Sequence, residues 1–514
     1  MLEERTELSS LPTESLCEIF QYLDDDIRTL YSCLQVNRFW CKQIVTILWQ
    51  NPMPNTYTSI NLGVFINSFE EEVKLELEQN HDINIKEMIK PLFNYEKYLK
   101  VLNLRGVRHA VFYWLKNYRL SKNPFFDECI NFNQNSTIDI IERSLMKLIL
   151  KNSYRIDHLI LDLSRRYDDI LEVEIFANEN YTGIRNITKF SFVNNTSEIC
   201  YNNIKNLLEI LPTLCKKIDI FKFYNLIYLH DEYESRLIKF IQNQHHLTSF
   251  DLSKGYINIS RMIMALKYQA ASLKSLKFNK ISFIDVSYFS FNHLINLEYL
   301  EIEGTYPIEF ILFPLSKANL KLKSFMAKFI EIDYNLKESI LKSSMNTLEE
   351  LYLEIYIPRI IGKSPLCHIC PNLTHLSIAL CIFDKIYDHI IIFLNYINNL
   401  KNLSHLLIEF SCTSNNEILD NFIKINLPNL KYFSFKFNDY SFISLKRWVK
   451  YFFNDIYFNK LIFYYKDCYL NIEQINLLNN FYIKNKKNNF SLICSNYFKF
   501  VAIKNKDTNM GSIE

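Results

Sequence analysis

A short apolar pattern, L-x-x-L-x-L, recurs along most of the chain and constrains its fold more than any other feature. Ile, Phe or Cys sometimes replaces Leu in it. Successive clear copies start 24 to 30 residues apart, and weaker copies lie on either side of them. The clear copies start at Leu247, Leu273, Leu297, Leu322, Leu348, Leu373, Leu403 and Leu430. The weaker copies start at Ile156, Ile187, Cys215 and Phe458.

The pattern predicts one strand in each copy. Residues four and six of a copy point to the same side of a strand and must be buried, but a single copy cannot bury them. Stacked copies would form a parallel sheet, with helices between the strands covering its buried side. Apolar helix faces of this kind comprise Ile386, Ile390, Phe393, Leu394 and Ile397, and also Leu336, Ile340 and Leu341.

This pattern and spacing resemble leucine-rich repeats. The resemblance implies an α/β solenoid, with a parallel sheet and helices on its convex side. The Asn or Cys expected three positions after the last Leu is mostly missing, and only Cys381 and Asn438 fit among the clear copies. We therefore expect an irregular solenoid without the asparagine ladder of the regular family. A non-repetitive α/β domain is the alternative.

Residues 11–49 predict three short helices at the N-terminus. Leu16, Ile19, Phe20 and Leu23 follow the i, i+3, i+4, i+7 spacing of one apolar helix stripe. Two further apolar groups follow, around Leu34 and around Trp40. About 40 residues are too few to bury all of this surface in a core of their own. The remaining apolar surface must pack on the rest of the chain or on a partner.

The same stretch resembles an F-box. The matching residues are Leu11, Pro12, Glu14, Leu16, Ile19, Phe20, Leu23, Leu30, Val36, Trp40, Leu48 and Trp49. Many members have Cys where this chain has Asn37, but Asn can end one helix and cap the next. The alternative is an ordinary N-terminal helical cap whose stripes are core.

The F-box resemblance implies docking on a Skp-family adaptor and, through it, on a cullin–RING ligase. By this match, the residues that face the adaptor or hold its docking helices are Leu11, Pro12, Leu16, Ile19, Phe20, Leu23, Leu34, Val36 and Trp40.

Composition limits the other classes of function. Lys+Arg and Asp+Glu balance to a net charge of +2 over 514 residues, so overall charge gives no argument for nucleic-acid or membrane binding. The first ten residues are charged and do not form a signal peptide, and the longest apolar stretch is too short for a membrane span. The twelve cysteines show no disulfide framework. We expect a cytoplasmic or nuclear protein with reduced thiols.

No catalytic or cofactor motif stands out. Seven glycines form no phosphate loop, and neither a metalloprotease helix motif nor a nucleophile elbow occurs. Cys367 and Cys370 have metal-ligand spacing, with His375 and Cys381 nearby, but a second close pair is missing. Buried thiols in a repeat turn are the better interpretation. We expect no metal, no cofactor and no catalytic residue.

Binding surfaces are then the remaining candidates for function. Positions three and five of each repeat face away from the buried side, and the two positions mix apolar and polar residues over a run of neighbouring repeats. Such a mixture suits protein recognition. The predicted target-binding residues are Met326, Glu350, Tyr352, His375, His405 and Leu407. The alternative is that a helix or a C-terminal segment of the chain covers this surface. A charge-alternating run, Asp251, Lys277 and Glu301, precedes these residues and is expected to be a surface ion ladder.

Four regions follow from these patterns. They are an F-box at 1–50, a helical linker with a first repeat-like strand at 51–150, leucine-rich repeats at 151–465, and a C-terminal cap with a polar tail at 466–514. Together the resemblances imply a substrate receptor of an SCF-type ubiquitin ligase, which directs a target protein to ubiquitination and proteasomal degradation by tethering it. A repeat-based interaction scaffold without ubiquitination is one alternative, and an enzyme with an unrecognised site is another.

Overall fold

In the computed structural model the chain divides into two compact units, Met1–Ile257 and Asn258–Glu514, called here unit 1 and unit 2. The structure describes residues 12–24, 26–53, 62–85, 88, 91–122, 136–163, 170, 173–178, 181, 183–194, 201–226, 229–255, 260–282, 293–305, 315, 317–318, 320–328, 340–356, 370–381, 397–413, 429–430, 432–439, 460–465, 490–495 and 499–504.

Unit 1 begins with the three short helices that the sequence predicts, α1 (Thr13–Gln21), α2 (Ile27–Leu34) and α3 (Arg38–Leu48). Asp26 caps α2 by accepting a hydrogen bond from the Thr29 amide at 3.1 Å. Asn37 caps α3 in the same way, with its Oδ1 2.8 Å from the Trp40 amide. The departure from the usual F-box pattern at Asn37 therefore has a local role, because a cap satisfies an otherwise unpaired amide.

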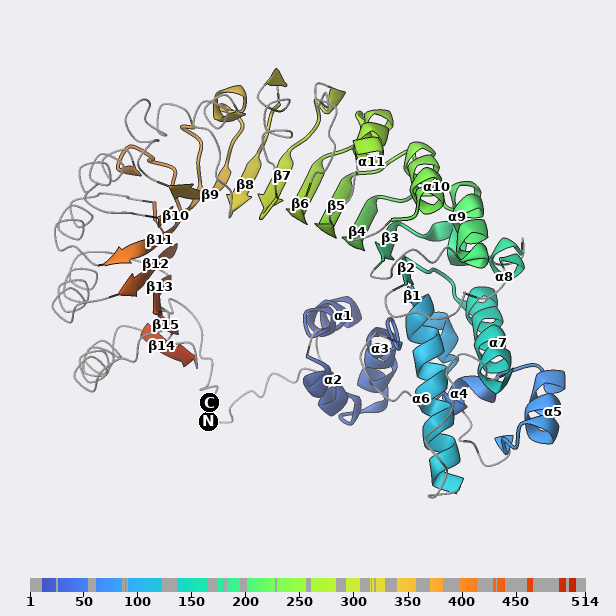
Figure 1. The fold of residues 1–514 in the computed structure, drawn as a ribbon. Coiled ribbons are helices and arrows are strands. Elements are labelled where there is room, and N and C mark those ends of the chain that lie inside the picture. The colour runs from blue at the N-terminus through green and yellow to red at the C-terminus, as the bar shows by residue number, and fades with distance from the viewer. Residues whose placement is uncertain are drawn as a thin grey trace, which may run out of the picture. The chain divides into compact units, whose positions relative to one another are not determined.

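The rest of unit 1 alternates helices and strands (Figure 1). The connecting region contains α4 (Gly63–Ile66), the exposed acidic α5 (Glu71–Asn80) and η3 (Tyr95–Tyr98). The following elements are β1 (Val101–Asn103), α6 (Leu104–Lys122), α7 (Ser136–Asn152), β2 (His158–Asp162), α8 (Glu174–Ala177), η4 (Gly183–Asn186), β3 (Lys189–Val193), α9 (Asn202–Leu214), β4 (Ile220–Leu226), α10 (Asp231–Gln242) and β5 (Ser249–Gly255).

Strands β1 to β5 pair in chain order, and every pair is parallel. Helices α8, α9 and α10 lie along one side of these strands (Figure 1). The core between them is aromatic: Phe240 of α10 lies 5.1 Å from Phe190 and 5.0 Å from Phe221, ring centre to ring centre. One strand and one helix per repeat thus bury a common apolar layer, as expected for stacked units.

Unit 2 continues the same pattern with β6 (Ser275–Ile281) to β13 (Lys460–Tyr465), again parallel and in chain order. It opens with α11 (Ser260–Ala265) and η5 (Leu266–Gln269). The intervening strands are β7 (Tyr299–Glu303), β8 (Ser324–Lys328), β9 (Glu350–Tyr356), β10 (His375–Cys381), β11 (His405–Thr413) and β12 (Tyr432–Asp439). The antiparallel strands β14 (Phe490–Ser495) and β15 (Lys499–Lys504) follow, and β15 pairs with β13.

The predicted fold class is confirmed: N-terminal helices precede a parallel sheet built from repeated α/β units. Part of the prediction for the connecting helices falls outside the described residues, namely Leu336, Ile386, Ile390, Phe393 and Leu394. Ile340, Leu341 and Ile397 are described, and all three are buried. The predicted polar tail also lies outside the described residues.

One predicted repeat is wrong in register. We expected a copy to start at Cys215, but Lys189 pairs with Ile220, so the copy starts at Ile218 and buries Phe221 and Phe223. Cys215 instead ends α9, and its carbonyl accepts a hydrogen bond from the Gln244 side chain. Buried residues at both 215 and 218 satisfy the apolar pattern, and only strand pairing distinguishes them.

A backbone ladder joins consecutive repeats within each unit. In most of the described repeats the carbonyl of the residue just before the strand accepts hydrogen bonds from two consecutive amides of the next repeat, and Gln50, after α3, accepts two amides in the same way. In unit 1 the accepting residues are Gln50, Lys100, Asp157, Thr188 and Asp219. In unit 2 they are Lys274, Glu298, Lys323, Glu349 and Thr374. The ladder satisfies backbone groups at each turn and fixes the register of the next strand.

The first acceptor in this ladder, Gln50, lies directly after the three N-terminal helices. Its carbonyl binds the amides of Lys100 and Val101 at 2.9 and 3.0 Å. Trp49 packs beside it, 4.1 Å from the ring of Tyr95 and 5.5 Å from that of Phe65. The end of α3 is therefore attached directly to the first strand of unit 1, through both backbone and side-chain contacts.

Asparagine side chains form a second ladder in unit 2, at a position that the sequence analysis did not consider. Asn296, Asn372, Asn402 and Asn429 each precede the first apolar residue of a repeat and donate to a carbonyl of the preceding repeat. The donor–acceptor distances are 2.9, 2.9, 3.5 and 2.8 Å in that order.

Strands β4 to β7 each include or end beside one residue in the left-handed conformation, seven positions after the first apolar residue of the repeat. These residues are Asn225, Lys254, Lys280 and Gly304, with φ between 53° and 57°. Gly304 adopts this conformation without steric cost, whereas Lys254 and Lys280 carry a Cβ atom that disfavours it.

We expect single substitutions at two of these positions to change the free energy of unfolding in opposite directions. Gly304→Ala should lower the free energy of unfolding by about 1–2 kcal/mol, since Ala disfavours positive φ. Lys280→Gly should raise it by less, because the added entropy of the unfolded chain offsets part of the gain. Urea denaturation of the full chain measures both. Equal effects of the same sign would contradict the repeated left-handed turn.

Candidate functional site

The three N-terminal helices form a small core of their own. Leu16 and Phe20 of α1, Leu30 of α2 and Ile44 of α3 are each at most 2% exposed and pack in one cluster. The rings of Phe20 and Trp40 meet edge to face, with centres 5.0 Å apart. Leu23, Leu34 and Trp40 pack around this cluster and are partly buried. These residues hold the helices together.

A second set of apolar side chains on the same helices faces solvent. Their exposed fractions are 43% for Ile19, 90% for Tyr22, 54% for Ile27, 59% for Tyr31, 57% for Val36 and 41% for Phe39. Ile27 and Tyr31 are four residues apart on α2 and share one helix face. Large exposed apolar side chains gathered on a short domain indicate a surface that another molecule covers.

The predicted adaptor-binding residues therefore fall into two groups. Leu16 and Phe20 are buried, and Leu23, Leu34 and Trp40 are partly buried, so all five belong to the side that holds the helices. Pro12, Ile19 and Val36 are exposed and available to a partner. Leu11 lies outside the described residues.

Four of the exposed residues are not among those predicted from the sequence. They are Tyr22, Ile27, Tyr31 and Phe39. The spacing of Ile27 and Tyr31, which places them off the stripe formed by Leu30 and Leu34, was a signal that could have identified them.

The six predicted target-binding residues all lie on adjacent strands of unit 2. In the strand register Met326 pairs with Tyr352, Glu350 with His375, and His375 with His405. Leu407 is 38% exposed and pairs with Ser377. The structure thus brings these side chains to neighbouring positions on β8 to β11.

Two histidines stand out on this surface, which we call the β8–β11 face (Met326, Glu350, Tyr352, His375, His405 and Leu407). The rings of His375 and His405 stack with centres 4.0 Å apart. The Nδ1 of each lies within hydrogen-bonding distance of the preceding hydroxyl, Thr374 at 2.9 Å and Ser404 at 2.8 Å. These contacts orient both rings. Burial and the Glu350 carboxylate raise the pKa of Tyr352, so its hydroxyl stays a hydrogen-bond donor.

Two of the three residues of the predicted ion ladder, Lys277 and Glu301, belong to unit 2 and form an ion pair. Lys277 Nζ lies 2.6 Å from the Glu301 carboxylate on the next strand. This pair precedes the β8–β11 face in the register, because Glu301 pairs with Met326. Exposed pairs of this kind contribute little to stability. By its position the pair forms a charged border to the apolar and aromatic part of the face.

A partly buried histidine lies on the corresponding surface of unit 1. His158 of β2 has its Nε2 2.8 Å from the Ser191 hydroxyl on β3. Burial lowers the pKa of His158 to about 4, with further contributions from the charges of Lys189 and Lys222. His158 is therefore neutral near pH 7 and lies in a locally positive region.

The described residues offer no obvious reactive centre. They contain no group of three or more His, Cys, Asp or Glu side chains arranged to hold a metal ion. Burial raises the pKa of the Cys215 and Cys370 thiols to about 12, which keeps them protonated and unreactive. Cys367, the other half of the considered metal pair, lies outside the described residues. No described helix has the length and hydropathy that crossing a bilayer requires.

Comparison with known proteins gives one family. Residues 8–54 match the model of the F-box-like family. No curated protein matches the chain. Among solved structures, a chain from "Structure of the Toll - Spatzle complex, a molecular hub in Drosophila development and innate immunity" is 13% identical. The match covers 65% of this chain and 46% of that chain, which is less than half of its length, and its TM-score of 0.32 is too low to carry an argument.

The low pKa of His158 predicts a pH dependence of stability. Its unfolded value is near 6.5, so between about pH 6.5 and pH 4 the unfolded chain binds the proton first. Stability should then fall as pH falls through that window, by at most about 1.4 kcal/mol per pH unit and less after solvent screening. His158→Gln, which cannot titrate, should remove this component in urea denaturation at a series of pH values. An unchanged pH profile in the variant would contradict the prediction.

Proposed function

We propose that this protein is the substrate-recognition subunit of an SCF-type ubiquitin ligase. Residues 8–54 would bind a Skp-family adaptor, and the repeats would bind a target protein. The chain itself would contribute no catalytic residue. It would raise the concentration of the target near a ubiquitin-charged enzyme, which is a gain from tethering alone. A cytoplasmic or nuclear location is part of the same proposal.

The observation that carries the proposal is that the F-box-like domain has two sets of apolar residues, one buried in its core and one exposed to solvent. Leu16, Phe20, Leu30 and Ile44 already close a core. Ile19, Ile27 and Tyr31 remain exposed, although burial of such side chains would be favourable by about 1.5–3 kcal/mol each. A domain that folds through one set of apolar residues and leaves another set exposed is suited to docking.

The attachment of the domain to the repeats supports a tethering role. The Gln50 carbonyl and the Trp49 ring contact the first strand and its neighbouring turn directly. Tethering is most effective when the connection spans the two binding sites in a suitable geometry. A direct attachment keeps the adaptor-binding helices in a defined position relative to the first strands of unit 1.

The β8–β11 face is the proposed target surface. It combines the exposed Leu407, the partly buried Tyr352 and the stacked pair of His375 and His405. Aromatic and apolar groups beside polar side chains are typical of protein-recognition surfaces. Histidines oriented by neighbouring hydroxyls add directional hydrogen bonding to such a surface.

Adaptor binding is tested with two sets of variants. Replacing Leu11 and Pro12 together by Ala should abolish co-purification with a Skp-family adaptor. Ile27→Asp with Tyr31→Asp should also abolish it, because both of these substitutions place a charge in an interface that excludes water. Measured affinity should fall at least tenfold, which corresponds to about 1.4 kcal/mol.

The control for these variants is Leu75→Asp on α5, which changes an equally exposed apolar residue outside the F-box-like domain. It should leave adaptor binding unchanged. Wild-type adaptor binding by both double variants would reject the ligase-receptor proposal and favour a repeat scaffold whose N-terminal helices only cap the first strand.

Target binding is tested by comparing the proteins that co-purify with each variant. Tyr352→Ala with His405→Ala should lose a subset of partners while retaining the adaptor, since these residues lie on a different unit from the F-box-like domain. Tyr299→Ala, an exposed tyrosine on β7, is the matched control. Identical partner sets for all three proteins, identified by quantitative mass spectrometry, would exclude the β8–β11 face.

A further inference from the structure

Cationic side chains gather where the chain enters strands β1 to β4 of unit 1. They are Lys97, Lys100, Arg155, Arg185, Lys189, Lys216 and Lys217, which we call the basic edge. The turns that carry them contribute only three carboxylates, Asp157, Asp219 and the buried Glu96. This local excess of positive charge exists in a chain whose net charge is only +2.

Most of these cations have no carboxylate partner among the residues that the structure describes. Arg155 forms an ion pair with Asp157 at 2.5 Å, and Lys97 lies 5.5 Å from the centre of the Tyr154 ring. Lys100 and Lys189 are exposed, and no described carboxylate lies within ion-pairing distance of either. Both are therefore available to an anion from outside.

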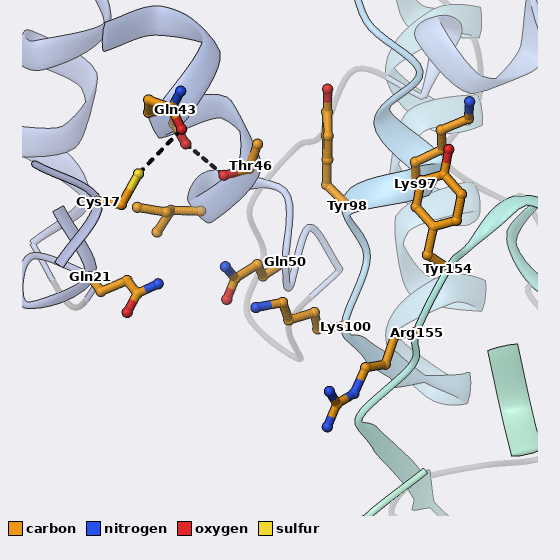
Figure 2. Close-up of a pocket in the computed structure, with 11 residues that line it drawn as sticks. Cys17, Gln21, Gln43, Thr46, Gln50, Lys97, Tyr98, Lys100, Tyr154 and Arg155 are labelled. Atoms are coloured by element: carbon orange, nitrogen blue, oxygen red, sulfur yellow. Dashed lines mark hydrogen bonds between the residues drawn. The ribbon is translucent and has the colours of Figure 1, made fainter. Parts of the chain in front are cut away.

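A pocket of about 250 Å³ opens at the start of the basic edge (Figure 2). Its lining combines Lys100 and Arg155 with Gln21 of α1, Gln43 of α3 and Gln50. Tyr98 and Tyr154 add two hydroxyls. None of the described residues that line it is Asp or Glu.

The lining of the pocket selects an anionic group. Lys and Arg bring only donors, and amide and hydroxyl groups bring further donors. A carboxylate can accept several of these hydrogen bonds at once. The volume lies below the roughly 300–1,000 Å³ typical of small-molecule sites, which suits one side chain of a larger partner.

The backbone ladder connects the pocket with the rest of the basic edge. The Lys100 carbonyl binds the Asp157 amide, and the Asp157 carbonyl binds the Lys189 amide. In the strand register Val101 and His158 are level with Lys189, so Lys100, one residue before Val101, lies two strand spacings and one residue step from Lys189, roughly 10 Å. About three residues of an extended peptide span that distance.

We propose that the pocket and the basic edge bind an acidic, extended segment of a partner protein. One carboxylate side chain enters the pocket beside Lys100, and the carboxylates that follow it lie along Lys189 and its neighbours. This surface is distinct from the exposed apolar residues of α1 to α3 and from the β8–β11 face, and it does not depend on the proposed ligase role.

A peptide fits this surface better than a nucleic acid does. Asp157 and Asp219 interrupt the positive charge between Lys100, Lys189 and the lysines before β4. A phosphate backbone carries a charge at every nucleotide and would meet both carboxylates, whereas alternate side chains of an extended peptide point away from the surface, so a peptide need not place a carboxylate beside either. The bases of a single strand usually stack on aromatic side chains. Tyr154 at the pocket is 71% exposed, but the turns before β3 and β4, which carry the rest of the basic edge, hold no aromatic residue on which further bases could stack.

His158 provides an independent reporter beside this surface. The charges of Lys189 and Lys222 help to keep its pKa low. A carboxylate bound near Lys189 would offset those charges, so the pKa of His158 should rise on binding. A structural role for the lysines alone would not produce such a change.

The test uses a fluorescein-labelled hexaglutamate peptide and the full chain, in fluorescence anisotropy at physiological salt. Wild type should bind it at least tenfold more tightly than a hexaglutamine peptide. Lys100→Glu with Lys189→Glu should weaken binding at least tenfold. Gln43→Glu, which places a carboxylate in the pocket and leaves the basic edge intact, should weaken it as well.

The matched control is Lys147→Glu with Lys267→Glu, the same change of charge at two lysines outside the basic edge. It should bind the peptide as wild type does. A control that loses as much affinity as the edge variant would overturn the proposal in favour of unspecific attraction. So would wild-type binding by the edge variant, or a His158 pKa that the peptide leaves unchanged.

Two further probes distinguish other anions. Tighter binding of a hexaphosphoserine peptide or of a single-stranded oligonucleotide, with no measurable binding of hexaglutamate, would overturn the assignment to carboxylates. Adaptor co-purification, measured on the same edge variants, should be unchanged. Failure of the peptide to bind thus remains distinguishable from failure of the proposed ligase role.

Discussion

The structure depends on a backbone contact that recurs from one repeat to the next. The Gln50 carbonyl after α3 accepts two amides of the first repeat, and carbonyls just before later strands, such as those of Lys100, Asp157 and Thr188, do the same for the repeat that follows. Side chains add to it: the hydroxyls of Thr248, Thr374 and Ser404 bind the same carbonyls. Each of these contacts positions one repeat on the one before it. Because the first contact comes from Gln50, the F-box-like helices are attached to the first repeat in the same way.

This regularity separates the residues that fold the protein from those that can bind. Alternate strand positions, such as Phe190, Phe221 and Phe250, fill the aromatic core against α9 and α10. The positions between them face outward and are released from packing, so their chemistry varies from Lys189 to His375 to Leu407. The F-box-like helices follow the same principle, with Phe20 inside and Tyr31 outside.

Charge is organised locally and not globally. The composition is balanced, yet unit 1 collects lysines that have no carboxylate partner among the described residues at one edge of its strands, and unit 2 pairs Lys277 with Glu301 across neighbouring strands. Burial lowers the pKa of His158, and the charges of Lys189 and Lys222 in the same region lower it further. Net charge describes the average surface, whereas recognition depends on which side chains the strand register places side by side.

The sequence by itself determined the period of the repeat, the three N-terminal helices and the strand positions of nearly every copy, because burial imposes a spacing that can be counted. It also placed Asn37 as a helix cap. Only the tertiary structure decided that the copy near Cys215 starts at Ile218, that Tyr22 and Ile27 are exposed while Leu16 is not, and that Lys100 shares a pocket with Gln21. Local periodicity states which residues prefer burial. Which of these residues are actually buried depends on pairing between segments that lie far apart in the chain.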